Sequence, residues 1–345
     1  MSKISSTSFY DEYHGHKISH LEALLPKLRE SSDSLIWTAG DSSLDNKFWI
    51  RDRQPAVGAY RDVLDPPTSV CDVTYWLNVI GQRQCDPKFA AINAAVEATT
   101  LNERTLTLTP QDLFIRDNIS IDDILVVSIG GNDVALKPTP CTICSMLLLL
   151  SLPSPCIENS RSCGSCPVDD YCYGCGPSLF SWGCAFPPCI GYFQHLFGVK
   201  TEKYIRKLIQ KTKPKMILVC MIYYPDEAKV PSWAGVALGA LGYNTRPDKL
   251  QLMIRKTFEL ATCRIQIPGS EVKPIPLFHV LDGKRTEDFV ARVEPSAIGG
   301  LRIAEFLLDS IREPSTNNVA QVIVRGSLTS APIQAPVTSY IQNRR

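Results

Sequence analysis

The chain has 345 residues, and its 36 Lys and Arg are nearly balanced by 35 Asp and Glu, so the formal net charge is +1. A protein that binds nucleic acid through phosphates needs a large surplus of basic residues on one face, and this balance argues against a nucleic-acid partner. The hydrophobic fraction of 44% and the charged fraction of 21% are ordinary for a globular protein and exclude bulk disorder.

The chain shows no convincing targeting or membrane segment. Residues 1–11 are polar and rich in Ser, without the apolar core of a secretory signal. The longest apolar stretch, residues 146–152, is far shorter than the roughly 20 residues that cross a bilayer. We therefore expect an intracellular, cytoplasmic protein without a membrane partner, in a compartment where thiols usually stay reduced.

Strands and helices are predicted to alternate along the chain. Short apolar, β-branched runs predict buried strands at 35–39, 89–93, 124–129, 216–223 and 275–281. Apolar residues with the helical period predict helices at 201–211, 246–263 and 297–311. This alternation indicates βαβ units, which build a parallel sheet with right-handed crossovers. The sequence thus predicts an α/β fold with its site at the carboxyl ends of the strands.

The expected organisation is a main domain at 34–313 that carries a Cys-rich insertion at about 138–198. Residues 1–33 are interpreted as an N-terminal extension. Residues 314–345 are rich in Ser, Thr, Asn, Gln and Pro, and we interpret them as a poorly ordered tail or as an edge strand followed by a tail.

The first predicted strand leads directly into Gly40, Asp41 and Ser42. A Gly at a strand end allows a tight turn, and a Ser just after it can project from the sheet edge as a nucleophile. Asp41 and Asp45 are suited to cap the following helix or to steady the loop. Taken alone, the same residues are also ordinary turn chemistry.

The third predicted strand, 124–129, ends in Gly130, Gly131, Asn132 and Asp133. The side-chain amide of Asn132 is a suitable N–H donor for an oxyanion, although Gly-Asn is also a plain strand-end turn. Two such motifs at the strand ends of one parallel sheet point together to a site.

With these motifs the sequence resembles the SGNH or GDSL hydrolase superfamily over most of residues 36–311. The resemblance implies a flavodoxin-like αβα sandwich, with a central parallel sheet of about five strands, that cleaves acyl esters. It also implies Ser42 as the nucleophile, through the match of Gly40, Asp41 and Ser42 to one block. The match of Gly130, Asn132 and Asp133 to another block implies Asn132 as an oxyanion donor.

Residues 91–99 resemble the family's second block, in which a glycine N–H usually faces the oxyanion. Glu97 or a neighbour stands in the place of that glycine. Because every residue except proline keeps its backbone N–H, this donor is expected to persist.

The family's last block is Asp-x-x-His-Pro, in which His is the general base and Asp orients it. This chain has Ala291 and Glu294 at those two positions, before Pro295. One interpretation makes Glu294 the base, with Asp288 or Arg292 setting its charge. The other assigns that role to His279 at the end of the preceding strand, although a strand histidine is more often packed in the core.

Other histidines are weaker candidates: His195 lies in the insertion, and His14, His16 and His20 are interpreted as solvated. A Glu with an ordinary pKa of about 4.3 is a poor base for a serine hydroxyl unless burial raises that pKa. The partial positive charge at the start of the helix after Pro295 acts in the opposite direction. We therefore expect Glu294 to position or stabilise charge, and any ester hydrolysis to be slow.

Nine of the 13 Cys lie between Cys141 and Cys189. Two-residue spacing lets a pair of thiolates bind one tetrahedral Zn²⁺, so three such pairs predict structural zinc. These pairs are Cys141 with Cys144, Cys163 with Cys166, and Cys172 with Cys175. Disulfides, lipid-modified cysteines and inert thiols are the alternatives. The segment shows little helical period, and its aromatic residues at 179–197 are interpreted as a packed lid or as a surface for a protein partner.

The leading hypothesis is an SGNH-type serine hydrolase that cleaves a small-molecule acyl ester without a catalytic cofactor. The alternative is a catalytically silent SGNH scaffold that acts as a binding or assembly module through its Cys-rich insertion.

Overall fold

The computed structural model describes residues 3–84, 88–162, 185–187 and 189–313. Its centre is a parallel sheet of five strands in the order β11-β10-β7-β2-β6. The strands are β2 (Ser34–Gly40), β6 (Phe89–Asn93), β7 (Ile124–Ser128), β10 (Met216–Met221) and β11 (Glu271–Pro276). The four strands other than β11 are buried along their whole length, as expected for a parallel sheet covered on both faces. This strand order is that of flavodoxin-like folds, and it confirms the predicted α/β sandwich.

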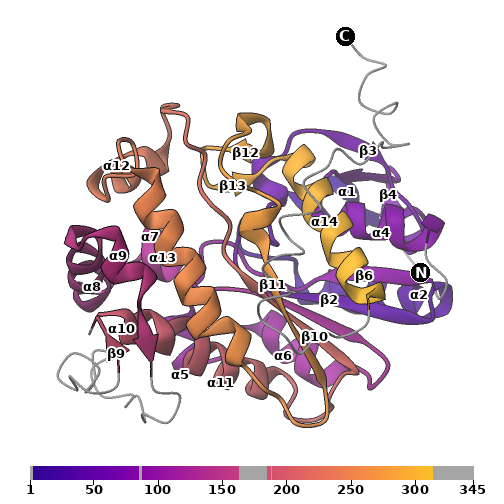
Figure 1. Ribbon diagram of the computed structural model, residues 1–345. Helices are drawn as coiled ribbons and strands as arrows, with labels where there is room; N and C mark the ends of the chain where they lie inside the picture. The colour runs from indigo at the N-terminus through magenta and orange to yellow at the C-terminus, as the bar shows by residue number, and fades with distance from the viewer. Residues whose placement is uncertain (1–2, 85–87, 163–184, 188, 314–345) are drawn as a thin grey trace.

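Two groups of helices cover the sheet (Figure 1). Helices α4 (Val73–Gln84) and α14 (Ala297–Arg312) pack together over one face. On the other face, α6 (Pro110–Asn118) contacts both α2 (Ile18–Ser31) and α11 (Thr201–Leu208). The predicted helices at 201–211, 246–263 and 297–311 are confirmed as α11, α13 (Pro247–Leu260) and α14.

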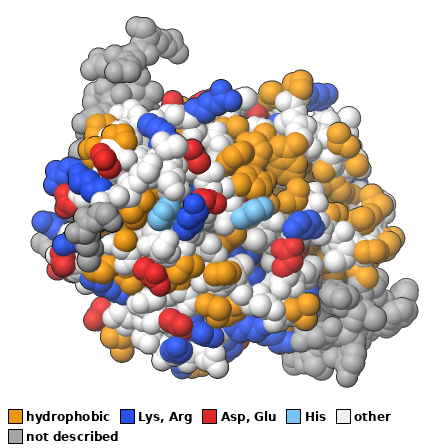
Figure 2. All heavy atoms as spheres, turned by 180° about the vertical axis from the view of Figure 1, so that it is seen from behind, with side chains coloured by type: hydrophobic (Ala, Val, Ile, Leu, Met, Phe, Trp, Pro, Cys, Tyr) orange, Lys and Arg blue, Asp and Glu red, His pale blue; other side chains and the backbone are white. Residues whose placement is uncertain are grey.

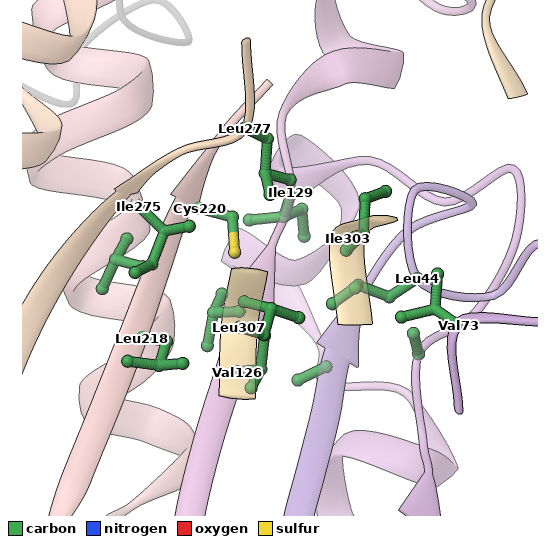
Figure 3. Packing of buried hydrophobic residues seen from close by; sticks show 14 of the residues in the cluster. Leu44, Val73, Val126, Ile129, Leu218, Cys220, Ile275, Leu277, Ile303 and Leu307 are labelled. Carbon is green, nitrogen blue, oxygen red and sulfur yellow. The ribbon is translucent and has the colours of Figure 1, made fainter. Parts of the chain in front are cut away.

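The core between α14 and the sheet consists of interlocking aliphatic side chains (Figure 3). Ile303 and Leu307, one helical turn apart on α14, are fully buried in the cluster that also contains Val126 of β7 and Leu218 of β10. Complete burial of such side chains contributes about 1.5–3 kcal/mol each to folding. This packing fixes the start of α14, and with it the residues that precede the helix, relative to the strand ends.

One predicted strand differs from the structure. Residues 275–281 were expected to be extended, but β11 begins earlier, at Glu271, and ends at Pro276. The chain then makes a 3-10 turn, Leu277–His279. Pro274 and Pro276 are tolerated because β11 is an edge strand, where a missing N–H need not pair.

The N-terminal residues pack onto the domain. Leu21, Leu24 and Leu28 lie on the buried face of α2, and β1 (Ile4–Ser5) pairs with β4 (Leu64–Asp65). The expectation that His16 is solvated was wrong, because its ring is 2% exposed, packs against Phe9 and bonds through Nδ1 to the Phe9 carbonyl at 2.8 Å.

The described part of the insertion is more helical than its sequence suggested. Helices α8 (Pro140–Ser151) and α9 (Ser154–Glu158) bury Met146, Leu149 and Ile157, and both contact α13. The helical period is hidden in the sequence because Leu147 and Leu148 are also apolar although they are about half exposed. Across the described ranges, no helix has both the length and the apolar character needed to cross a bilayer.

Apolar side chains gather in the upper right of Figure 2, on the side where Figure 1 places α8 and α12 (Trp233–Ala240). Exposed members of these helices are Ile143, Leu147, Leu148, Trp233 and Val236. Both helices contact α7 (Gly131–Ala135), so this surface adjoins the loop that carries Asn132.

The remaining elements are short. They are α1 (Ser6–Tyr10), α3 (Ala59–Val63), α5 (Leu101–Leu106), α10 (Ile190–Gln194), β3 (Arg53–Pro55), β5 (Thr68–Val70), β8 (Arg161–Ser162), β9 (Ala185–Phe186), β12 (Phe289–Val290) and β13 (Glu294–Pro295).

Candidate active site

Gly40 ends β2 in a conformation that other residues rarely adopt. Its φ is +128°, and a Cβ on it would lie 1.8 Å from the carbonyl oxygen of Ser128 on β7. The Gly40 carbonyl accepts hydrogen bonds from the Arg104 guanidinium at 2.8 Å and from the Val96 N–H at 3.0 Å. This backbone conformation at Gly40 places the next residues at the carboxyl ends of the strands.

The two serines after Asp41 have different partners. The Ser43 hydroxyl donates to Asp41 Oδ1 at 2.8 Å and lies 2.6 Å from Ser128 Oγ. The Ser42 hydroxyl instead donates to Glu294 Oε1 at 3.3 Å. Ser42 is 8% exposed, and Glu294 is 4% exposed. Thus the structure brings together Ser42 and Glu294, which are 252 residues apart in the sequence.

A tight antiparallel hairpin of β12 and β13 presents Glu294. Ala291 and Arg292 turn the chain with φ values of +51° and +72°. The hairpin is anchored on both sides of Glu294, because Tyr223 donates its hydroxyl to the Val293 carbonyl at 2.6 Å and Asn46 donates its amide to the Pro295 carbonyl at 3.0 Å.

Burial raises the pKa of Glu294 to about 8, and the negative charge of Glu97 contributes next. The net shift is therefore upward, although the start of the following helix was expected to act in the opposite direction. The first-turn N–H of Gly299 is already capped by the Ser296 hydroxyl at 3.2 Å, whereas the Glu294 carboxyl is buried among other acidic groups.

Asp288 and Arg292, expected to set the charge of Glu294, have other partners. Asp288 accepts from Arg285 at 3.0 Å and pairs with Arg302 at 3.3 Å. Arg292 donates to the Asp226 carbonyl at 2.9 Å. Both side chains hold the hairpin region in place, so this part of the expectation was wrong.

The histidines considered as a base lie beside residues other than Ser42. The ring of His279 packs against Phe278 at 4.7 Å, and burial together with the charge of Arg255 lowers its pKa. His195 is buried in the π-helical turn His195–Lys200. His14 lies closer to the site, since its Nδ1 is 3.3 Å from the Glu97 carbonyl oxygen.

The second loop begins at Gly130, whose φ is +107°. Burial raises the pKa of Asp41, and the Gly130 N–H partly offsets this rise, so the two loops lie close together. The Asn132 side-chain amide donates to the Thr99 carbonyl at 3.0 Å, and Asn132 is 7% exposed.

Asp133 has a structural contact of its own. Its two oxygens accept the N–H groups of Leu101 and Asn102 at 2.7 and 2.9 Å, at the start of α5. Burial nevertheless raises its pKa to about 6.

Glu97 lies at the same edge of the sheet. Its backbone N–H, expected to stay available, donates to Asp45 Oδ2 at 3.0 Å. Asp45 also accepts from Lys47 at 2.6 Å, and both side chains are fully buried. The Glu97 carboxyl accepts from the Trp49 indole N–H, and burial followed by the charge of Asp45 raises its pKa to about 8.

Sequence reasoning did not identify Lys47, Trp49, Thr99 or the Glu97 carboxyl as parts of this site. A signal existed for the first two, because Lys47 and Trp49 follow the first motif within seven residues of Ser42. The partner of Trp49, Glu97, comes from a distant part of the chain, whereas Lys47 pairs with the nearby Asp45.

The predicted zinc ligands are only partly described. Cys141 is disulfide-bonded, whereas Cys144 is a free, exposed thiol, so these two do not form the expected pair of thiolate ligands. Among residues whose placement is described, no group of three or more His, Cys, Asp or Glu side chains is arranged to hold a metal. Cys163, Cys166, Cys172 and Cys175 lie outside the described residues, and zinc binding there stays a prediction.

No family model and no curated protein matches the sequence. Solved structures with a similar fold include a lipase from a goat rumen metagenome, at 12% identity and a TM-score of 0.44, covering 80% of this chain and 97% of that one. An acetyl xylan esterase variant from Geobacillus stearothermophilus is 13% identical, with a TM-score of 0.38 and coverage of 84% and 99%. A GDSL-like lipase from Bacteroides ovatus is 11% identical, with a TM-score of 0.38 and coverage of 81% and 53%.

Proposed function

We propose that this protein is a serine hydrolase of acyl esters in which Glu294 replaces histidine as the proton acceptor. The observation that carries the proposal is the 3.3 Å hydrogen bond from the Ser42 hydroxyl to Glu294 at the carboxyl edge of the parallel sheet. A nucleophile and its base must lie within hydrogen-bonding reach, and apo structures often show this contact slightly long. The raised pKa of Glu294 makes its carboxylate a better base than an ordinary glutamate.

In the proposed reaction the Ser42 oxygen attacks the ester carbonyl while its proton moves to Glu294. The Asn132 amide and the Ser42 N–H stabilise the oxyanion. Within the described residues, the Ser42 N–H has no protein acceptor. When the tetrahedral intermediate collapses, the proton passes from Glu294 to the departing alcohol, and water then hydrolyses the acyl-enzyme by the same route.

The second candidate is a silent scaffold, and two contacts favour it. Asn132 already donates an N–H to the Thr99 carbonyl, and the Glu97 N–H is occupied by Asp45. Of the N–H donors on Asn132, Glu97 and Ser42, an oxyanion could therefore use the second N–H of Asn132 and the N–H of Ser42.

Hydrolysis of p-nitrophenyl acetate and butyrate by wild type, Ser42→Ala and Ser43→Ala separates the two candidates. The proposal expects Ser42→Ala to lose turnover, and Ser43→Ala, the matched control outside the reacting group, to retain it. A fluorophosphonate label should map to Ser42. Asn132→Ala should lower kcat by about 10²–10³. Turnover that is background in wild type and unchanged in Ser42→Ala would support the silent scaffold.

A further inference from the structure

Exposed large hydrophobic side chains are concentrated in the segments that follow β7 and β10. Across the described ranges, 11 such side chains are exposed, and six of them belong to α8, α12 and the C-terminal end of α7 (Figure 2). Single exposed apolar residues are normal, but a contiguous group of them marks an interaction surface. We call these six side chains the apolar face: Leu136, Ile143, Leu147, Leu148, Trp233 and Val236.

The helices turn these side chains outward because another stripe of each helix is already buried. On α8 the buried stripe includes Met146 and Leu149. Ile143 and Leu147, one helical turn apart, are 46% and 51% exposed. On α12 the buried stripe includes Leu238. A surface helix normally presents polar residues to water, so two apolar outer faces beside α7 indicate a partner that is itself apolar.

The apolar face carries no charge. The segments 138–157 and 230–245, which contain α8 and α12, have no Asp, Glu, Lys, Arg or His. The charged residues at the borders of these segments are of both signs and balance one another. They are the ion pairs Lys137–Glu103 at 2.8 Å and Arg246–Asp248 at 3.0 Å, together with Lys229 and Glu158. The face therefore matches a surface without net charge and offers nothing to a charged one.

The size of the apolar face fits a lipid surface better than a second protein. A stable protein interface usually involves about 20–30 residues on each side, whereas this face is built on six large side chains. Helices with an apolar face need no matched partner to lie in a lipid–water boundary. Trp233 supplies the type of ring that is enriched at that boundary.

The apolar face also adjoins the candidate active site. Helix α7, which contacts both α8 and α12, carries Asn132. Two further exposed rings, those of Tyr13 and Phe48, contact each other at 4.8 Å, and Phe48 contacts Trp49 of the site at 5.8 Å. A lipid surface against the apolar face would thus lie next to the loop that holds the proposed oxyanion donor.

We propose that the apolar face docks this protein on the surface of a zwitterionic lipid aggregate, from which the site takes a long-chain acyl ester. The choice of substrate rests on the proposed function, whereas the docking does not. The sequence predicted no membrane partner because its apolar stretches are too short to span a bilayer, and no helix of the described ranges is long enough. Docking on a surface needs an exposed apolar face instead, and the fold assembles one.

The first test is co-sedimentation of the full chain with phosphatidylcholine vesicles. Wild type should bind, and the fluorescence emission of Trp233 should shift to shorter wavelength, a change that Trp233→Phe removes. Val236→Glu places a charge at a side chain that is 82% exposed, and it should lower the vesicle partition coefficient about tenfold. Leu147→Glu makes the same test on α8.

The matched control is Ile121→Glu. Ile121 is 66% exposed but precedes β7 at the amino end of the sheet, so this variant should bind vesicles like wild type. Absence of binding, or binding that neither Val236→Glu nor Leu147→Glu weakens, would overturn the proposal. Binding that requires phosphatidylserine and disappears at high salt would also overturn it, because the attraction would then be electrostatic. A dimer that Val236→Glu dissociates would assign the face to a second copy of the chain instead.

The second test compares p-nitrophenyl palmitate in phosphatidylcholine vesicles with p-nitrophenyl butyrate in solution. Val236→Glu should lower hydrolysis of the vesicle ester about tenfold and leave hydrolysis of the soluble ester unchanged. An equal effect on both esters would overturn the link between docking and substrate. Vesicle binding without Ser42-dependent hydrolysis would support docking and refute the proposed function. Ser42-dependent hydrolysis of the soluble ester without vesicle binding would do the reverse.

Discussion

Replacing Glu294 by Gln is expected to stabilise the folded protein at neutral and alkaline pH. Burial and the charge of Glu97 raise the pKa of Glu294 from 4.5 to about 8. Between these pH values the folded state holds a proton that the unfolded chain has lost. Unfolding then releases a proton, so the free energy of unfolding falls as the pH rises through this interval.

The size of the change in the free energy of unfolding follows from the interval between the unfolded and the folded pKa of Glu294. Each pH unit between the unfolded and the folded pKa lowers the free energy of unfolding by about 1.4 kcal/mol. From about pH 4.5 to pH 7 the wild type loses about 3 kcal/mol through this group. Gln cannot ionise, retains the shape of the side chain and still offers an oxygen to the Ser42 hydroxyl. The variant should therefore resemble wild type near pH 5 and exceed its stability by a few kcal/mol at pH 8.

Urea unfolding followed by far-UV circular dichroism at pH 5, 6, 7 and 8 measures this difference, provided that the m-value is unchanged. Glu30→Gln is the control, because Glu30 makes an exposed contact with Lys27 at 2.7 Å. Such a surface pair contributes about 0–1 kcal/mol, so the control should follow wild type at every pH. Parallel stability curves for wild type and Glu294→Gln would refute the reasoning, because they would show that burial does not hold a proton on this group.

Three further predictions concern the scaffold of the site. Gly40→Ala should lower the melting temperature far more than Gly242→Ala. A Cβ at Gly40 would lie 1.8 Å from the Ser128 carbonyl oxygen, whereas a Cβ at Gly242 would meet nothing within 4 Å and only the φ of +70° would add strain. Equal losses in thermal denaturation would contradict this prediction. Arg104→Ala should cost about 3–5 kcal/mol in urea unfolding, because it leaves Asp112 buried without its 2.9 Å partner, and a loss under 1 kcal/mol would be evidence against the buried pair. If Cys163, Cys166, Cys172 and Cys175 bind structural zinc, elemental analysis should find zinc in a simple ratio to protein, and metal-free folded protein would exclude that prediction.

Local sequence patterns determined the framework of this protein. The strands β6 and β7 were predicted almost to the residue, because a strand buried on both faces needs a continuous apolar run and turn residues at its end. Gly40 and Gly130 were identified for the same kind of reason, since the backbone turns at these two strand ends require positive φ. Helix α14 was found because one apolar stripe with a period of 3.6 covers the sheet.

Only the tertiary structure decided the chemistry around Ser42. Whether Glu294 or His279 meets its hydroxyl depends on the direction of the β12–β13 hairpin, which distant anchors such as Tyr223 and Asn46 set. The raised pKa values of Glu97 and Glu294 likewise depend on burial first and then on a neighbouring charge, that of Asp45 for Glu97 and that of Glu97 for Glu294. Neither quantity can be read from a local sequence pattern. A sequence specifies which groups are present, but a pKa depends on the free energy of transferring a charge into surroundings that only the folded chain assembles.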